Sequence, residues 1–404
     1  MDAAKFAELS SWLTEAGLAG NSETEIVDGF CGRAVTAGLP IARAMVIIDT
    51  LHPVHEGRVV RWRREGQERQ AELIEYGPTN EGEAAESWQR SAFFRLREEG
   101  GSRLRRRLVA GEPAEFPAVV TLQNEGMTDY LALITRFAAD GVIGEMDCVY
   151  SSWATDHPRG FDDREVEALI GLMPLLALAV KCVSLTRIAG TLVETYLGRD
   201  AGRRVLAGRI RRGIAEPIGA VLWYSDLRGF TRITDQAPPQ QVIPLLNDYA
   251  EAVISAVHDS GGDVLKLIGD GTLAIFTSGS TDEACRCAIE AETTLRRRVD
   301  ELNRRRAGES LPTTDVYLGL HVGEVFYGNI GSKDRLDFTV VGPAVNEVSR
   351  IAAMCRSAER NVLLSAAFAE AVAEPERSRL VSVGRYALRG VERPQELFTL
   401  TPAA

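Results

Sequence analysis

Two segments in the second half of this chain decide its fold: VLWYSDLRGFTRITD at 221–235 and GGDVLKLIGDGTLAIF at 261–276. In each segment an aspartate, Asp226 or Asp270, follows an apolar run typical of a β-strand. The second segment predicts a β-hairpin whose strands are joined by a tight turn at 269–271. A carboxylate held in such a turn has little freedom. Two of them together would form an oxygen site of the kind that Mg²⁺ or Mn²⁺ prefers.

Glycine follows both aspartates closely, at Gly229 and Gly271. Because glycine has no side chain, a phosphate can approach the main chain there and accept hydrogen bonds from its N–H groups. The alternative interpretation is structural, because aspartates in turns often only cap the local backbone. The pair by itself leaves both interpretations open.

Further motifs accompany this pair. Four of them occur in order: SDLRGFT (225–231), LKLIGDGTLAIF (265–276), HVGEVFYGNIG (321–331) and FTVVGPAVNEVSRI (338–351). Together they resemble the class III nucleotidyl cyclases, the adenylyl and guanylyl cyclases, of bacterial type. The resemblance covers a little under half of the chain and implies a catalytic domain at 215–404 with a ferredoxin-like, palm-type α+β fold.

The order of expected elements suits a βαββαβ core with additions. The expected elements are a strand at 219–226, a helix at 238–262, the hairpin at 264–276, a helix at 281–306, two strands within 315–330, helices at 345–355 and 366–373, and a strand at 379–390.

The resemblance implies that ATP is converted to 3′,5′-cyclic AMP and pyrophosphate with two divalent ions, Mg²⁺ or Mn²⁺, per site. Asp226, Asp270 and the Leu227 carbonyl would bind the ions. Asn346 and Arg350 are four residues apart and would share one face of a helix. Arg350 would then face the phosphoryl oxygens, and Asn346 would face the ribose. The alternative is that both are ordinary polar residues of a surface helix. The expected triphosphate contacts are Arg228, Gly229, Phe230, Thr231 and Arg389.

Base selection depends on Lys266 and Thr339. In the family, lysine with aspartate or threonine at these positions accompanies adenine, and glutamate with a small residue or cysteine accompanies guanine. Lysine can donate to adenine N1, whereas guanine N1–H would leave that donor unpaired, at a cost on the order of 1–3 kcal/mol. ATP is therefore expected and GTP is the alternative. A lysine that only extends to solvent is the structural alternative.

The resemblance also implies a homodimer. In the family, the metal-binding aspartates of one chain face the base- and phosphate-binding residues of the other, so two equal sites are shared between the subunits.

Pro343-Ala344 departs from the Asp-Thr that the family often has, and proline removes a backbone donor there.

Three other classes of protein compete with the cyclase interpretation. The GGDV at 261–264 resembles the opening of the GGDEF signature of diguanylate cyclases, but the Glu-Phe is missing. The P-loop pattern GxxxxGK[ST] does not occur. A catalytically silent nucleotide-binding module should have lost some of the site residues, and all are present.

The first half, 1–182, resembles a GAF-type sensor domain in its pattern of elements. The expected elements are helices at 1–20 and 22–37, strands at 42–51 and 57–66, helical sequence at 84–99, strands at 130–137 and 145–155, and a helix opened by Asp162 and Glu165. Such a domain would bind a small-molecule ligand or only dimerise. His52, His55 and His157 lie in expected loops, where a structural role is the simpler interpretation.

Residues 183–214 are expected to be a helical linker that relays a signal. Gly198 should interrupt it, with a second helical piece at 201–210. Six arginines lie within 199–212 and would suit nucleic acid, but a solvated helix or dimer seam is favoured in an acidic protein.

The 404 residues carry a net charge of −11, which argues against a general nucleic-acid binder. The six scattered cysteines indicate reduced thiols. The N-terminus lacks the apolar core of a signal peptide, and the longest apolar run, 168–180, is too short to span a bilayer. We therefore expect a cytoplasmic protein that binds neither membrane nor nucleic acid.

Overall fold

The computed structural model describes residues 1–404 except 66–67, 139–141, 278, 390–393 and 402–404. The chain divides into two compact units, Met1–Leu192 and Val193–Ala404. Each unit mixes helices with one antiparallel or mostly antiparallel sheet, as the sequence predicts.

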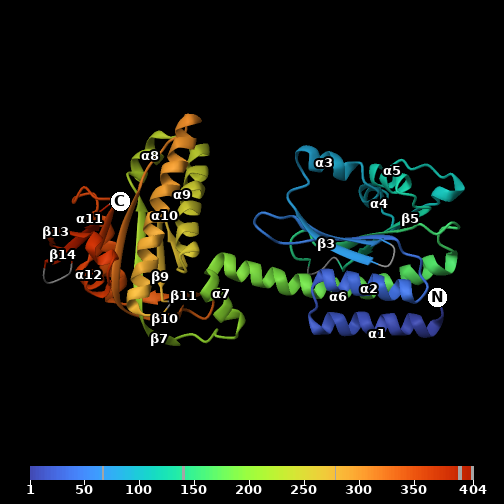
Figure 1. The fold of residues 1–404 in the computed structure, drawn as a ribbon, viewed down its shortest axis with the longest axis horizontal. Helices are drawn as coiled ribbons and strands as arrows, with labels where there is room; N and C mark the ends of the chain where they lie inside the picture. The colour runs from blue at the N-terminus through green and yellow to red at the C-terminus, as the bar shows by residue number, and fades with distance from the viewer. Residues whose placement is uncertain (66–67, 139–141, 278, 390–393, 402–404) are drawn as a thin grey trace. The chain divides into compact units, whose positions relative to one another are not determined.

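The first unit is built on a six-stranded antiparallel sheet with the order β3-β2-β1-β6-β5-β4. Its strands are β1 (Arg43–Asp49), β2 (Gly57–Glu65), β3 (Glu68–Tyr76), β4 (Arg103–Arg106), β5 (Asp129–Arg136) and β6 (Cys148–Thr155). Its helices are α1 (Ala3–Ala19), α2 (Glu23–Thr36), α3 (Gly82–Gln89), α4 (Ala92–Glu98), α5 (Pro117–Asn124) and α6 (Asp163–Leu197), the last of which continues into the second unit. Helices α1, α2 and α6 cover one face of the sheet, and α3, α4 and α5 lie over the other (Figure 1).

Strands β3 and β4 lie in segments rich in charged residues, where the sequence predicted no strand. They form the two edges of the sheet. An edge strand needs little apolar surface and commonly carries charge, so its alternation is weak in the sequence. The predicted capping box at the start of α6 is confirmed, because Asp162 and Glu165 exchange hydrogen bonds of 2.8 Å between side chain and backbone N–H.

Helix α6 is longer than the apolar run at 168–180 suggested. By length and composition alone it could cross a membrane, so the expectation that this segment is too short was wrong. A buried core helix meets the same criteria. Leu169 and Leu172 are fully buried in the core of the first unit, and 44% of the most apolar part of α6 is buried. The helix runs past residue 183 without a break and ends before Gly198, whose φ is 87°.

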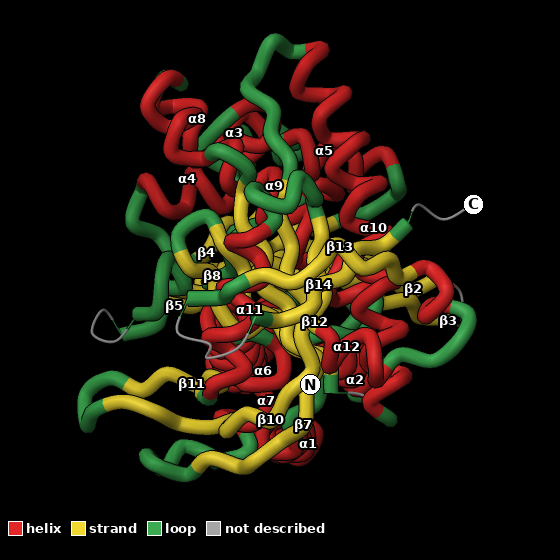
Figure 2. The backbone as a smooth tube through the Cα atoms, turned by 90° about the vertical axis from the view of Figure 1, so that its left-hand side faces the viewer, coloured by secondary structure: helices red, strands yellow, loops and turns green. Residues whose placement is uncertain are grey.

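The second unit contains the predicted βαββαβ order in β7, α9, β8, β9, α10 and β10. Its strands are β7 (Ala215–Leu227), β8 (Asp263–Ile268), β9 (Gly271–Phe276), β10 (Val316–Gly331), β11 (Leu336–Val341), β12 (Val362–Ser365), β13 (Leu380–Tyr386) and β14 (Gln395–Leu400). Its helices are α7 (Arg199–Leu206), α8 (Phe230–Gln236), α9 (Pro239–Asp259), α10 (Thr281–Gly308), α11 (Pro343–Met354) and α12 (Ala366–Ala371). The sheet has the order β13-β14-β12-β10-β7-β9-β8, with β11 paired to β10 (Figure 2).

The sequence predicted two strands within 315–330, but β10 is a single long strand. Glycines that suggested a break instead permit close packing. A Cβ at Gly319 would lie 2.6 Å from the Val348 carbonyl of α11, and one at Gly328 would lie 2.2 Å from the Ile214 carbonyl. These glycines therefore mark close backbone approach within a strand.

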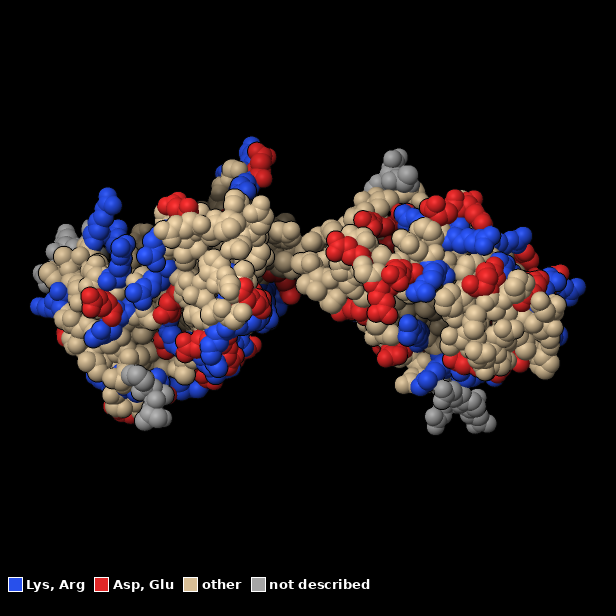
Figure 3. Space-filling view, turned by 90° about the horizontal axis from the view of Figure 1, so that it is seen from above, with Lys and Arg blue, Asp and Glu red and all other residues tan. Residues whose placement is uncertain are grey.

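Helices α9, α10 and α12 pack on one face of this sheet, and α11 packs on the other. All six cysteines are free thiols. The arginine-rich segment after Gly198 is partly neutralised, because Arg204 pairs with Asp200 at 2.7 Å and Arg209 with Glu216 at 2.9 Å. On the surface seen in Figure 3, basic and acidic side chains are interspersed.

Candidate active site

Asp226 lies near the carboxyl end of β7, in the centre of the second sheet. Side chains alternate along a strand, so Asp226 has the orientation of Ala220 and Leu222. Those two residues belong to the apolar cluster that α11 covers. Asp226 therefore points to the α11 side of the sheet, beyond the end of that cluster.

Asp270 lies in the two-residue turn between β8 and β9, because Ile268 pairs directly with Gly271. Strand β9 is hydrogen-bonded to β7, and this pairing carries Asp270 to the end of β7. There its Oδ2 accepts a hydrogen bond of 3.3 Å from the Leu227 N–H. The predicted hairpin is confirmed, and it brings the two aspartates together.

The two carboxylates concentrate negative charge at the end of β7. Partial burial, followed by the hydrogen bond and the negative charge of Asp270, raises the pKa of Asp226 to about 6. The pKa of the Tyr224 hydroxyl is also raised. Burial is the largest cause, and the negative charges of Asp226 and Asp270 add to it. Two carboxylates that share a site repel one another unless a proton or a metal ion lies between them.

Within the described residues, no group of three or more His, Cys, Asp or Glu side chains could hold a metal ion. Main-chain oxygen such as the Leu227 carbonyl would therefore have to complete a metal site. Two histidines of the first unit have turn roles: His52 Nδ1 accepts from the Val54 and His55 N–H groups, and His157 Nδ1 accepts from Arg159 N–H. The third, His55, has its Nε2 3.4 Å from the Glu75 carboxylate.

The backbone after Asp226 leads into a short helix. Gly229 adopts a left-handed conformation with φ 69°, and helix α8 begins at Phe230. The first intrahelical bond runs from the Ile233 N–H to the Gly229 carbonyl. The N–H groups of Phe230 and Thr231 precede that bond, in the first turn, where helical N–H groups lack intrahelical acceptors.

Helix α11 carries Asn346 and Arg350 at the predicted spacing. Ala344 and Val348 fix the helix to the sheet face toward which Asp226 points. Pro343 is the first residue of the helix, where proline is favoured because no backbone donor is needed. The departure at 343–344 is thus accommodated locally.

Lys266 has a partner that the sequence analysis did not name. Its ammonium pairs with the Asp337 carboxylate on β11, and both side chains are about two-fifths exposed. Asp337 and Thr339 alternate on the same side of β11, opposite to the buried Phe338. An acidic residue two positions before Thr339 was the available signal. Lys266 is thus both exposed and ion-paired, and its role in base selection stays a prediction.

Two other predicted positions have different surroundings. Arg389 is exposed in a turn after Leu388 and directly precedes residues outside the described part of the chain. Arg228 is fixed by its backbone, since its N–H donates to the Asp315 carbonyl at 2.8 Å.

His321 on β10 is buried near this site and had no predicted role. Its Nδ1 lies 2.8 Å from Ser365 Oγ and its Nε2 lies 3.7 Å from Glu347, the neighbour of Asn346. Burial lowers the pKa of His321, and the Glu347 charge opposes this shift. A histidine inside an apolar strand was the only sequence signal.

The sequence family described as the adenylate and guanylate cyclase catalytic domain matches residues 216–402. An adenylate cyclase of Anabaena cylindrica is 32% identical over 171 residues, which are 41% of this chain and 33% of that protein. The chain therefore spans about a third of the length of this curated relative.

Among solved structures, the adenylyl cyclase CyaB from P. aeruginosa matches with a TM-score of 0.43 at 21% identity, over 47% of this chain and 97% of that one. The guanylyl cyclase Cya2 matches with a TM-score of 0.41 at 26% identity, over 46% of this chain and 93% of that one. The family match and the relatives support a class III cyclase catalytic domain in residues 216–402.

Proposed function

We propose that the second unit, with its class III cyclase catalytic domain, converts ATP into 3′,5′-cyclic AMP and pyrophosphate. One observation carries the proposal: Asp226 at the end of β7 and Asp270 in the β8–β9 turn meet so closely that Asp270 makes ionisation of Asp226 unfavourable. Carboxylates in that arrangement gain from a bound cation, as a reaction on a triphosphate requires.

The donor set fits divalent metal ions. Two carboxylates and the nearby Leu227 carbonyl offer the hard oxygens that Mg²⁺ and Mn²⁺ prefer. When bound, two such ions would supply Lewis acidity for attack of the ribose 3′-OH on the α-phosphate and would neutralise the departing pyrophosphate. The residues of the chain would bind and orient the nucleotide.

Asn346 and Arg350 would hold the ribose and the phosphoryl oxygens, respectively. They lie one turn apart on α11, so they share a face. The backbone from Arg228 to Thr231, where α8 begins, would bind the terminal phosphates through the N–H groups of Gly229, Phe230 and Thr231, and Arg389 would add a positive charge.

Adenine is favoured over guanine because Lys266 is a donor placed beside Asp337 and Thr339. An ammonium paired with a carboxylate keeps a proton available for adenine N1, and the carboxylate can accept from the exocyclic amine of the same base. Guanine presents N1–H and O6 and would leave these groups mismatched. A guanylyl cyclase is the alternative.

We also propose that two copies share the sites. Several apolar side chains near Lys266 and Thr339 are exposed. They are Leu267 (54%), Ile268 (45%), Phe326 (53%) and Val341 (42%). An apolar surface beside a polar site is typical of a face that another subunit covers. In a symmetric dimer, the aspartates of one chain would face α11 and Lys266 of the other.

The first unit is proposed to be a GAF-like sensor that regulates the cyclase, with residues 183–214 as the relay. Within the second unit, α7 is attached to β10 by the Tyr327 hydroxyl, which donates to Asp200 at 3.0 Å. The Asn329 amide on β10 also donates to the Arg209 carbonyl at 2.7 Å. A shift of this segment would therefore act on the strand that pairs with β11 and Thr339.

Product analysis tests the proposal. The purified chain is incubated with ATP or GTP and Mg²⁺ or Mn²⁺, and nucleotides are separated by chromatography. We expect cyclic AMP from the wild type and from Asp300→Asn, an exposed change on α10, but none from Asp270→Ala. Formation of cyclic GMP instead of cyclic AMP would show that the site selects guanine. ATP binding without product, including from residues 200–404 as a dimer, would favour a silent module.

A further inference from the structure

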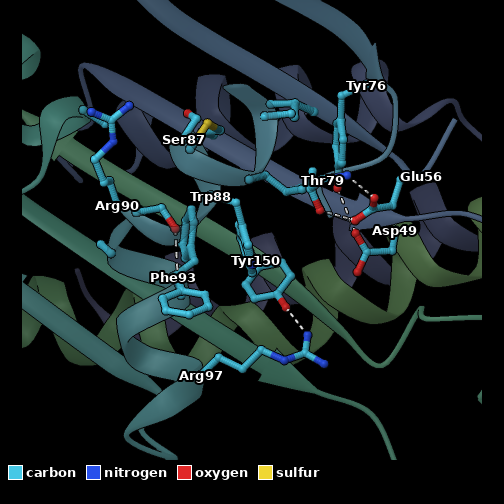
Figure 4. Close-up of a pocket in the computed structure, with 18 of the residues that line it drawn as sticks. Asp49, Glu56, Tyr76, Thr79, Ser87, Trp88, Arg90, Phe93, Arg97 and Tyr150 are labelled. Atoms are coloured by element: carbon cyan, nitrogen blue, oxygen red, sulfur yellow. Dashed lines mark hydrogen bonds between the residues drawn. The ribbon is translucent and has the colours of Figure 1, made fainter. Parts of the chain in front are cut away.

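The first unit contains a cavity of about 760 Å³ between the sheet and helices α3 and α4. Figure 4 shows its two ends. Asp49, Glu56, Tyr76 and Thr79 form the polar end, and Trp88, Phe93, Arg97 and Tyr150 lie toward the other. The volume is sufficient for a small organic molecule.

Asp49 occupies an unusual position at the polar end. Met45, Ile47 and Asp49 alternate along β1 and face the same side of the sheet, the side that lines the cavity. The first two are apolar, as this face requires, and the third is a carboxylate that is only 8% exposed. Burial, more than any neighbouring charge, raises its pKa to about 6. A buried carboxylate in a cavity wall is costly unless a partner stabilises it.

The hydrogen-bond partners of the two carboxylates at the polar end are neutral groups. Among the described residues, no ion pair involves Asp49 or Glu56. Asp49 accepts a hydrogen bond of 2.8 Å from the Tyr76 hydroxyl, and Glu56 accepts from the N–H and hydroxyl of Thr79. These donors are neutral. The charge of Arg97 stabilises the ionised Asp49 without forming an ion pair with it, whereas Glu56 and Asp147 add negative charge.

The arginines that line the cavity do not make it an anion site. Arg97 is neutralised by Asp147 at 3.2 Å and donates to the Tyr150 hydroxyl at 2.6 Å. Arg61 and Arg90 are exposed, so their charges lie in solvent at the margin. The deeply buried charge is the negative one, and charge in a low-dielectric interior acts more strongly on a ligand.

An aromatic wall faces the rest of the cavity. Trp88 and Tyr150 meet edge to face with ring centroids 5.4 Å apart, and Phe93 lies 5.4 Å from the same tyrosine. Aromatic faces attract cations and also pack against apolar groups. A ligand that carries one positive charge and an apolar body would satisfy both ends.

We propose that this cavity binds a small organic amine, with its ammonium group between Asp49 and Glu56 and its apolar body against Trp88 and Tyr150. The proposal concerns the first unit alone and does not depend on the reaction of the second. It assigns the sensor a chemical class of ligand.

Calorimetric titration of the full chain tests the proposal. The probes are the protonated forms of butylamine, phenethylamine and tryptamine, and 3-phenylpropionate serves as the anionic counterpart of phenethylamine. We expect saturable binding of at least one amine, strongest for an aromatic one, and none of the carboxylate. Asp49→Asn keeps the side-chain shape and should weaken amine binding at least about tenfold.

Matched controls separate the site from the fold. Glu86→Gln removes an exposed carboxylate of α3 and should leave amine affinity unchanged. Trp88→Leu keeps the charges and should weaken the aromatic amines more than butylamine. If Asp49→Asn fails to fold, Glu56→Gln supplies the charge test. Equal or tighter binding of 3-phenylpropionate would overturn the proposal, as would the absence of binding by all three amines up to about 10 mM.

Discussion

Two aspartates, Asp49 in the first unit and Asp226 in the second, both have a pKa raised to about 6, but their neighbours differ. Asp226 faces a second carboxylate, Asp270, at the end of a sheet. Asp49 faces a phenol and an aromatic-lined cavity. The first arrangement suits a small divalent ion that binds several oxygens, and the second suits a larger ion with an apolar body. A raised pKa marks both sites, and the surrounding side chains decide which cation fits.

The largest expected effect concerns the shared site of the second unit. Asp226→Ala and Arg350→Ala chains should each lose cyclase activity on the order of 1,000-fold, because each lacks one half of every site. After subunit exchange, a mixture should recover about one quarter of wild-type activity. Half of its dimers would be mixed, each with one intact site. Cyclic AMP formation measures the outcome, and no recovery despite demonstrated exchange would refute shared sites.

Divalent metal should distinguish the Asp226–Asp270 site of the second unit from the Asp49 cavity of the first. Mn²⁺ at a hundredfold to a thousandfold excess over its Kd should stabilise the second unit by about 3–4 kcal/mol. This stabilisation should disappear in Asp270→Asn and persist in Asp49→Asn. Hydrogen exchange of peptides from β7 and β9 measures it for that unit alone. Mn²⁺ protection that depends on Asp49 would break the distinction between the sites.

A change at Lys266 tests how the site of the second unit selects the nucleotide base. Lys266→Ala should lower kcat/KM for ATP by about 10–200-fold, because Asp337 and the base then lose their shared donor. GTP turnover should change less. The control is Lys333→Ala, an exposed lysine in the turn before β11. Equal losses for ATP and GTP would assign Lys266 a structural role.

The smallest expected effect is the pH dependence of the first unit. The pKa of Asp49 is higher in the folded state than its ordinary value of 3.8, so the folded chain holds this proton more tightly. The free energy of unfolding should therefore fall by about 1–3 kcal/mol as pH rises from about 4 to 6, and then stay level. Tyr76 and Arg97 oppose the shift, and Glu56 and Asp147 increase it.

This dependence is measured as the difference between wild type and Asp49→Asn in hydrogen exchange of β1, since other titrating groups cancel in that difference. An identical pH profile in both proteins would show that Asp49 is not the titrating group. A bound amine should flatten the wild-type profile, because it stabilises the ionised carboxylate.

Much of the second unit could be predicted because its signals are local. The hairpin at 264–276 combines apolar strands with a tight glycine turn. Asn346 and Arg350 are four residues apart, a spacing that places both on one face of the helix α11. The single strand β10 was not predictable in this way. Its glycines look like breaks in the sequence, whereas they accommodate backbone from α11 and from residue 214.

The sequence by itself determined the βαββαβ order of the second unit, the candidate metal and phosphate residues and the resemblance to the cyclases, since each depends on residues near one another in the chain. Only the tertiary structure decided that Lys266 pairs with Asp337, because those residues are 71 positions apart. It also decided that Asp49 faces a cavity with Trp88 and Tyr150. The burial of Asp49 and its hydrogen bond from Tyr76 depend on surroundings assembled from different strands, and no local sequence pattern reveals them.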